Sequence, residues 1–116
     1  MDNFKKLDIW IKSMSVVTEI YQITNTFPSL ERFGLISQMQ RSAVSIPSNI
    51  AEGSAKTSNK DFARFLEISI GSAFELETQL IVSYNLKYID TIAFENLSDK
   101  ISEIQRMIYG FKNKLN

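Results

Sequence analysis

The spacing of the apolar residues constrains the fold of this chain more than any other feature. In four successive segments these residues recur every three or four positions, the pattern of a helix that buries one face. No stretch shows the sustained alternation with a period of two that marks a half-buried strand. The 116 residues include only 4 Gly and 2 Pro, too little turn chemistry for an all-β fold with its tight corners. The pattern predicts an all-α protein.

Two prolines and a glycine mark the ends of the first two expected helices. The first helix is expected over residues 7–26 and stops before Pro28, because proline lacks an amide donor and disfavours helical geometry in the residue before it. The second is expected over residues 35–52, with Pro47 either kinking it or splitting it in two and Gly53 ending it in a left-handed cap. The first helix presents a stripe of Leu7, Trp10, Met14, Val17 and Tyr21, widened by a second line of Ile9, Val16, Ile20, Ile23 and Phe27.

Capping residues and short connections define the last two helices. Ser58 and Asp61 resemble a capping box, so the third helix is expected to begin there and to run to about residue 88. The fourth helix follows Asp90. The connections are about five to nine residues long, and short connections between long helices favour antiparallel neighbours. We therefore expect residues 1–116 to form one domain, an antiparallel up-down-up-down four-helix bundle.

The residue types on which most enzymes depend are missing. The chain contains no Cys and no His, which excludes disulfides, thiolate metal sites, a cysteine nucleophile and a histidine base. Its four glycines are isolated, so it has no phosphate-binding glycine loop. Glu75 and Glu77 are two positions apart and point in different directions on a helix. Glu95 and Asp99 share a face, but among surface-type neighbours. A Ser–Lys hydrolase arrangement stays open, although no signature singles out one serine and one lysine. We expect no enzymatic activity, no cofactor and no metal.

No segment of the sequence resembles a membrane span or a targeting signal. Every stretch of about 18 residues contains polar or charged side chains. The first residues, MDNFKK, are not followed by the apolar run and small-residue cleavage site of a signal peptide. We therefore expect a cytoplasmic protein that does not engage a membrane.

The second and third expected helices carry more uncharged surface than a monomer needs. Between residues 33 and 51 the only charged side chain is Arg41, whereas a helix of a small bundle normally carries charge along its solvent side. A second ridge on the third helix, rotated by about 100° from its core stripe, comprises Ala63, Ile70, Phe74 and Ile81. This ridge either belongs to a broad core widened by the first helix or forms a contact between subunits. In the second case the expected oligomer interface comprises Arg41, Val44, Ser48, Ala63, Ile70, Phe74, Glu75 and Ile81.

Arg41 also needs a partner for its charge. Glu52, on the same flank of the helix, is eleven residues away, which is about 16 Å at ~1.5 Å per residue, so the two cannot pair. Because an uncompensated buried charge is costly, we expect Arg41 to meet a carboxylate, with Glu75 and Glu77 as candidates. A structural pair within the fold and a contact with a ligand or a second subunit both remain open.

The second expected helix carries the longest motif of the chain. Residues 38–53, QMQRSAVSIPSNIAEG, resemble the signature QxRRAxxSIPxNIAEG of the four helix bundle proteins encoded by intervening sequences within bacterial 23S rRNA genes. Gln40 departs from this pattern, since many members carry a second basic residue there. The flanking pieces also fit, namely Leu7-x-x-Trp10, Phe27-Pro28 with Glu31 and Gly34-Leu35, and Gly71-Ser72-x-x-Glu75-Leu76-Glu77 before Leu80.

The resemblance implies an antiparallel four-helix protomer that assembles into a homopentameric ring. The chain is also similar to the accessory variability determinant of diversity-generating retroelements, a barrel that binds nucleic acid and reverse transcriptase. The role implied is that of an accessory protein that interacts with RNA or DNA and has no known catalytic activity. The molecular function of the family is poorly defined.

The charge distribution of such a bundle favours one end for binding a polyanion. The 13 basic and 13 acidic residues give no net charge, so overall attraction to phosphates is absent. In an up-down-up-down bundle, however, the N-terminus, the second turn and the C-terminus lie at one end, and a ring would multiply any patch there. The lysines expected at that end are Lys5, Lys6, Lys56, Lys60, Lys112 and Lys114.

Two functions therefore remain open at this point. One is weak, non-specific binding of RNA or DNA through the basic end of the ring. The other is a protein–protein adaptor or scaffold that binds no nucleic acid. The second is consistent with the balanced charge and with the lack of an evident exposed aromatic platform for base stacking. Lysines near a helix C-terminus, such as Lys112 and Lys114, also offset the helix dipole without any ligand.

Overall fold

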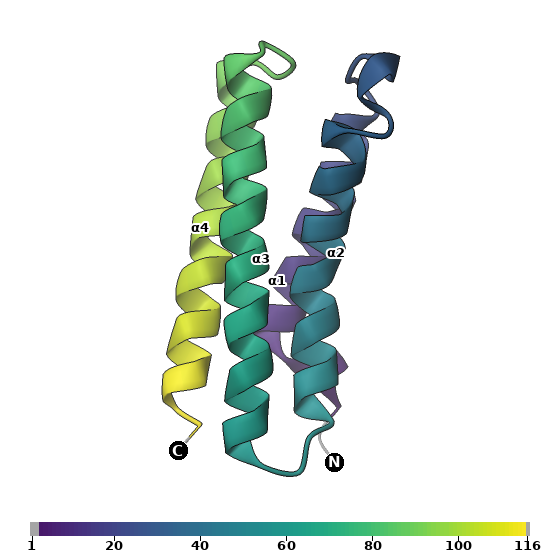
Figure 1. Ribbon diagram of the computed structural model, residues 1–116. Coiled ribbons are helices and arrows are strands. Elements are labelled where there is room, and N and C mark those ends of the chain that lie inside the picture. Colours follow the sequence, from purple (N-terminus) through teal and green to yellow (C-terminus); the bar gives the residue numbers. More distant parts are fainter. Residues whose placement is uncertain (1–2, 116) are drawn as a thin grey trace.

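The structure, a computed structural model, describes residues 3–115 and consists of four long helices with short connections (Figure 1). No strand is present within these residues, so the prediction of an all-α protein is confirmed. The molecule measures 43 × 24 × 20 Å. The helices are α1 (Asp8–Thr24), α2 (Leu35–Ser54), α3 (Asn59–Asn85) and α4 (Thr91–Asn113), with the 3-10 turns η1 (Phe4–Lys6) and η2 (Ser29–Glu31) before α1 and α2.

The helices lie side by side, each in contact with two others. α2 packs against α1 and α3, and α4 packs against α3 and α1. The turn between α2 and α3 lies at the bottom of Figure 1, together with η1 and the last turn of α4. The α1–α2 connection and the α3–α4 turn lie at the opposite end, which we call the loop end. Segments distant in the sequence are therefore gathered at each end of the molecule.

The beginnings of α3 and α4 follow the capping residues. The Ser58 Oγ accepts a hydrogen bond from the Asp61 amide at 3.1 Å, and the Asp90 Oδ1 accepts one from the Ala93 amide at 2.8 Å. Each of these bonds satisfies an amide that the first turn of a helix leaves without an intrahelical acceptor. Both predicted helix starts are confirmed.

α2 differs from its prediction at Pro47 and at Gly53, the two residues that were expected to kink or split the helix and to end it. It continues through Pro47, so the alternative in which this proline splits the segment is wrong; a kink there stays a prediction. The predicted left-handed cap at Gly53 is also wrong, because the helix extends to Ser54 and no glycine has a positive φ. Gly53 is instead buried against α3, where a Cβ would lie 2.7 Å from the Phe65 Cβ. This glycine allows the close approach of two helices.

The second apolar line of α1 is buried more deeply than the first stripe, of which Leu7, Trp10 and Val17 pack against the edge of the core. Ile9, Val16 and Ile20, from the second line, are buried, whereas Met14 and Tyr21 of the first stripe are 39% and 42% exposed. The buried face of α1 also includes two hydroxyl residues, Ser13 and Thr24, which donate to the carbonyls of the residues one turn earlier. Because these bonds are made within the helix, the hydroxyls are satisfied and tolerated inside the core.

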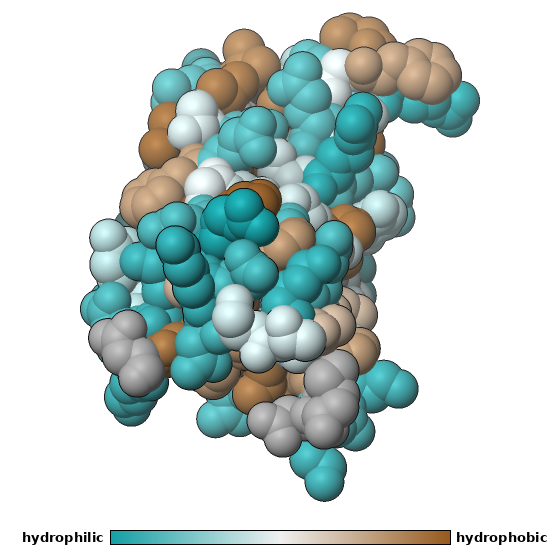
Figure 2. Space-filling model, turned by 60° about the horizontal axis from the view of Figure 1, so that its bottom comes forward, coloured by the Kyte–Doolittle hydropathy of each residue, from teal (hydrophilic) through white to brown (hydrophobic). Residues whose placement is uncertain are grey.

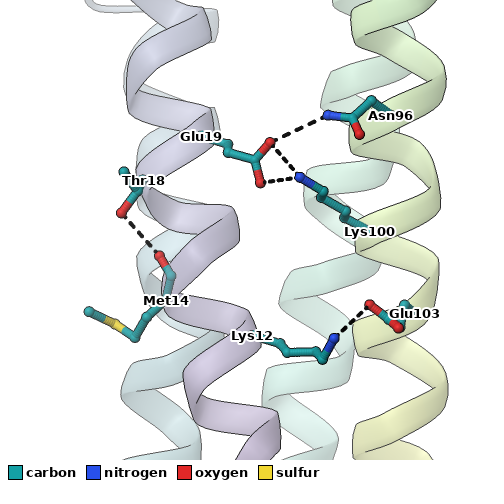
Figure 3. Close-up of polar contacts among 7 residues, drawn as sticks. All are labelled: Lys12, Met14, Thr18, Glu19, Asn96, Lys100 and Glu103. Atoms are coloured by element: carbon teal, nitrogen blue, oxygen red, sulfur yellow. Dashed lines mark hydrogen bonds and ion pairs between the residues drawn. The ribbon is translucent and has the colours of Figure 1, made fainter.

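Ion pairs connect α1 to α4 along one side of the bundle (Figure 3). The Glu19 carboxylate accepts from the Lys100 Nζ at 2.8 and 2.9 Å, and from the Asn96 Nδ2 at 3.4 Å. Below this pair in Figure 3, the Lys12 Nζ lies 3.5 Å from the Glu103 Oε1. The charges along this side are therefore matched within the chain.

Glu31 links the two connections of the loop end. One of its carboxylate oxygens accepts from the Leu35 amide at 3.3 Å, at the start of α2, and the other accepts from the Tyr88 hydroxyl at 2.8 Å. Gly34 leaves room for this carboxylate, since a Cβ there would lie 3.1 Å from its Oε1. The hydrogen bond to Glu31 raises the pKa of Tyr88, and partial removal from water and the negative charge of Glu31 add to this effect.

Gly53→Ala tests the close approach of α2 and α3. The new Cβ would meet the Cβ of Phe65, which a side-chain rotation cannot move away, so we expect the free energy of unfolding to fall by about 1–3 kcal/mol. Urea unfolding monitored by circular dichroism measures this change. The matched control is Gly110→Ala, where no atom lies within 4 Å of the added Cβ, and we expect it to raise the stability by about 0.5–1 kcal/mol. Equal effects of both variants would contradict the assigned role of Gly53.

Tyr88→Phe tests the bond at the loop end. The pKa of Tyr88 is above the ordinary 10.0, so the bond adds stability below that pH, and this contribution is lost as the pH rises through the pKa of the folded state. In an alkaline titration followed by tyrosinate absorbance, Tyr88→Phe should remove a component that titrates above pH 10.0. Tyr21→Phe, which changes an exposed tyrosine, should leave this component in place. An unchanged titration of Tyr88→Phe would refute the assignment.

Candidate nucleic-acid and subunit interfaces

The structure brings the six predicted lysines to one end of the molecule, which we call the lysine end. Lys5 and Lys6 lie in η1. Lys56 lies in the turn between α2 and α3, and Lys60 lies at the start of α3. Lys112 and Lys114 lie at the end of α4 (Figure 1). In Figure 2, which brings this end forward, hydrophilic side chains gather over it. The lysine end consists of Lys5, Lys6, Lys56, Lys60, Lys112 and Lys114.

The six lysines are not equally available to a ligand. The Lys112 Nζ lies 3.3 Å from the Glu67 Oε2 and over the Tyr109 ring, and its side chain is only 22% exposed. The Lys56 Nζ lies 4.9 Å from the centroid of the Phe65 ring, a cation–π contact that leaves its charge uncompensated. Among residues 3–115, the other four lysines have no carboxylate within 4.0 Å. They are therefore the better candidates for phosphate contacts.

Arg64 is a further cation at this end that the sequence analysis did not identify. It follows Lys60 by four residues on α3, so the two side chains lie on the same face of the helix. Arg64 is 68% exposed and pairs with Asp61 at 3.4 Å. Together with Lys112 and Glu67 these residues line a hollow of about 620 Å³ between α3 and α4. The i, i+4 spacing of two cations was the signal that could have revealed this residue.

The expected interface residues lie on two different flanks of α3. Glu75 faces α2, because it lines a groove with Arg41. Ala63 faces α4, because it lines the hollow with Lys112. On the outer surface Phe74 and Ile81 are 52% and 43% exposed, and on α2 the exposed positions include Val44 and Ser48.

The structure corrects the prediction that Ile70 lies in an oligomer interface. Its side chain is 7% exposed and belongs to the core of the chain itself. The expected ridge is therefore divided. Ile70 belongs to a broad core, which was one of the two alternatives, whereas Phe74 and Ile81 are exposed. The reason is the angle of each position around α3, because Ile70 is closer to the core residues Leu66 and Ala73 than its ridge partners are.

A polar groove of about 660 Å³ separates the outer edges of α2 and α3 toward the loop end. Arg41 and Glu75 lie on its two sides, and neither forms an ion pair within residues 3–115. The alternative in which Arg41 pairs with a carboxylate of its own chain is therefore wrong among the described residues, and a contact with a ligand or a second subunit stays a prediction. Glu77 points away toward α4, where its Oε1 accepts from the Gln105 Nε2 at 3.0 Å. The groove is lined by Phe33, Ser37, Gln38, Arg41, Ser42, Ser45, Glu75 and Gln79.

Three residues on the Glu75 flank of α3, of which Gln79 lines the groove, were missed from the sequence. The Gln79 Oε1 is buried and has no hydrogen-bond donor among the described residues. Ile68 and Val82 are 48% and 41% exposed, and each lies seven residues from Glu75, on the same flank of α3. The seven-residue spacing was visible in the sequence, but nothing in it indicated that Gln79 would lack a donor.

No group of three Asp or Glu side chains in residues 3–115 comes close enough to hold a metal ion. Glu95 and Asp99 are both exposed on α4. None of the described helices combines the length and apolar character that crossing a membrane requires.

Comparisons with known proteins agree with this four-helix arrangement. The model of the 23S rRNA-intervening sequence protein family matches residues 5–110 of the chain. A crystal structure of a protein of unknown function, from the S23 ribosomal protein family of Bacteroides thetaiotaomicron, matches with a TM-score of 0.84 and 24% sequence identity. The match covers 91% of this chain and 96% of that chain. None of the curated proteins matches. Because the family model extends from η1 into the last turns of α4, the chain belongs to the 23S rRNA-intervening sequence protein family.

Proposed function

We propose that this protein is a non-catalytic accessory protein that binds RNA or DNA weakly and without sequence preference, through the lysine end of a homo-oligomer. The observation that carries the proposal is the gathering of three separate chain segments, each with two lysines, at one end of the bundle.

A chain without net charge can attract phosphates only if its charges are separated in space. Along the α1–α4 side the cations and carboxylates pair with one another, so their fields largely cancel. At the lysine end Lys5, Lys6, Lys60 and Lys114 have no carboxylate partner among the described residues. Asp8, Glu52 and Asp61 also lie at this end, so the excess of cations there is modest. Contacts from lysine to phosphate position a protein on nucleic acid but do not read its sequence, hence the expected lack of specificity.

Assembly would turn this weak patch into a binding surface. We infer an up-down-up-down protomer, since successive connections alternate between the two ends of the bundle, and a pentameric ring, which the resemblance of residues 38–53 supports. A ring with cyclic symmetry places the same end of every protomer on one side. Several weak contacts on one side can then hold a polyanion that a single protomer would release.

The two flanks of α3 fit a ring better than a two-fold dimer. A closed ring needs two different complementary patches on each protomer, whereas a two-fold dimer needs one self-complementary patch. The first patch is the groove with Arg41, Glu75 and the unpartnered Gln79 Oε1. The second is the exposed apolar pair Phe74 and Ile81 on the outer side of α3. In the proposed ring, polar groups of the neighbouring copy beside its Phe74 and Ile81 pair with Arg41 and Glu75, because the apolar pair itself cannot partner these charges.

The triple variant Lys5→Glu, Lys6→Glu, Lys114→Glu tests the nucleic-acid site. Because each lysine–phosphate contact releases a counterion, we expect the wild-type affinity for a single-stranded RNA to fall steeply with salt and the variant to lose both affinity and salt dependence. Fluorescence anisotropy at several salt concentrations measures this. The control Arg32→Glu, Lys87→Glu makes the same kind of change at the loop end and should bind like the wild type. If the wild type fails to bind RNA or DNA even at low salt, the adaptor function replaces this proposal.

Two variants that each destroy one patch test the ring. Arg41→Glu in the groove and Phe74→Ser, Ile81→Ser on the outer flank should each reduce the mass measured by light scattering to that of a monomer. Mixed together they should form one-to-one dimers, because each retains one intact patch. The control Ile11→Ser changes an equally exposed apolar residue on α1 and should leave the ring intact. A monomeric wild type at micromolar concentration would refute the ring, and either variant that dimerises alone would indicate a two-fold contact instead.

A further inference from the structure

The hollow between α3 and α4 at the lysine end is lined by three cations and two carboxylates. Lys60 and Arg64 come from the first two turns of α3, and Lys112 comes from the last turn of α4. Asp61 and Glu67 are the two carboxylates, so cations are in excess among the lining residues. The volume of about 620 Å³ lies within the range of roughly 300–1,000 Å³ that is typical of sites for small ligands. The hollow is therefore large enough and basic enough to hold an anionic group.

Neither carboxylate holds its cation tightly. The Glu67 Oε2 lies 3.3 Å from the Lys112 Nζ, and the Asp61 Oδ1 lies 3.4 Å from the Arg64 Nη2. Strong charge-assisted hydrogen bonds are about 2.7–2.9 Å long, as in the 2.8 Å pair between α1 and α4 (Figure 3). The Glu67 and Asp61 side chains are also 62% and 47% exposed, and exposed ion pairs add little stability. An incoming anion can therefore displace both carboxylates at little cost.

We propose that this hollow binds the terminal phosphate of an RNA or DNA strand. The inference rests on the proposed function and names the part of the nucleic acid that the site holds. A terminal phosphomonoester carries a charge of about −1.5 to −2 at pH 7 and presents three acceptor oxygens. A phosphate within the strand carries a single negative charge and has a sugar bonded on both sides. The three cations of the hollow therefore favour a terminal phosphate over an internal one.

The three cations offer different contacts to such a phosphate. The planar guanidinium of Arg64 can donate two parallel hydrogen bonds to two phosphate oxygens. Lys60, four residues earlier on the same face of α3, has no carboxylate partner among the described residues and can bind a third oxygen. Lys112 exchanges its neighbouring carboxylate for the phosphate. Ala63 and Leu115 form apolar parts of the wall, which lower the local dielectric constant and strengthen each of these contacts.

The lysines outside the hollow favour a strand over a free nucleotide. Lys5, Lys6, Lys56 and Lys114 lie at the same end but are not among the residues that line the hollow. They can contact the phosphates that follow the terminal one, and each further contact releases a counterion. A free nucleoside monophosphate has no following phosphates, so it should bind more weakly. We therefore assign the hollow to the end of a strand.

Two forms of one RNA test the inference. A short single-stranded RNA with phosphates at both ends should bind about tenfold more tightly than the same RNA with hydroxyl ends, in fluorescence anisotropy with an internal label. The variant Lys60→Gln, Arg64→Gln should abolish this difference. The control Lys5→Gln, Lys6→Gln should weaken the binding of both RNAs equally and keep the difference. Equal affinities of the wild type for the two RNAs would overturn the inference and leave the proposed function intact, whereas binding of neither RNA would overturn both.

Glu67→Gln should give a gain of affinity, which a folding defect cannot produce. It frees Lys112 from its carboxylate, so the phosphate-ended RNA should bind about two- to fivefold more tightly, with little change for the hydroxyl-ended RNA. The matched control is Glu103→Gln, which removes an equal charge from the 3.5 Å pair with Lys12 on the α1–α4 side and should leave the difference between the two RNAs unchanged. An unchanged or weaker affinity of Glu67→Gln for the phosphate-ended RNA would contradict binding in the hollow. Competition by adenosine 5′-monophosphate as strong as that by the phosphate-ended RNA would assign the hollow to a free nucleotide and overturn the strand-end site.

Discussion

The close approach of α2 and α3 at Gly53 determines much of the remaining geometry. A Cβ at this position would overlap the side chains of Phe62 and Phe65, so only glycine lets the two helices approach so closely. Higher in the bundle the Ser69 Oγ donates to the Ile46 carbonyl at 2.9 Å, and the Ser45 and Ser72 hydroxyls lie 2.8 Å apart. Small residues thus line the contact along its length. Toward the loop end this close contact gives way to the groove in which the charges of Arg41 and Glu75 stay apart.

The helices and their order could be predicted because each follows from local rules. Apolar spacing gave the four helices, and Ser58 and Asp90 gave two of their first turns. Predictions from local rules were incomplete or wrong where the outcome depends on contacts between helices. The buried face of α1 contains Ser13 and Thr24, which satisfy their hydroxyls within the helix, so apolar spacing alone did not show that the second line is buried more deeply than the first stripe. Gly53 was assigned to a cap because a sequence does not show how near the next helix lies.

The candidate surfaces could be predicted only in part, because contacts between helices also decide which of their residues are exposed and unpaired. The lysines meet at one end because η1, the turn between α2 and α3 and the last turn of α4 lie together there. Their individual availability depends on neighbours from other helices, such as Glu67 beside Lys112. Ile70 was placed on a surface ridge although a small difference in angle around α3 buries it. The lack of a donor for the Gln79 Oε1 depends on a gap between helices, which no sequence pattern encodes.

The side chains of the motif at residues 38–53 have different roles in the structure. Ile46 and Ile50 are fully buried in the core, and Gly53 permits the contact with α3. The Asn49 Nδ2 donates to the Ser45 carbonyl at 2.8 Å, so this polar side chain is satisfied within α2. Arg41 is exposed, forms no ion pair with any described residue and contributes nothing to the core. The fold does not require this cation, and its exposure beside the groove agrees with the proposed contact between neighbouring copies there.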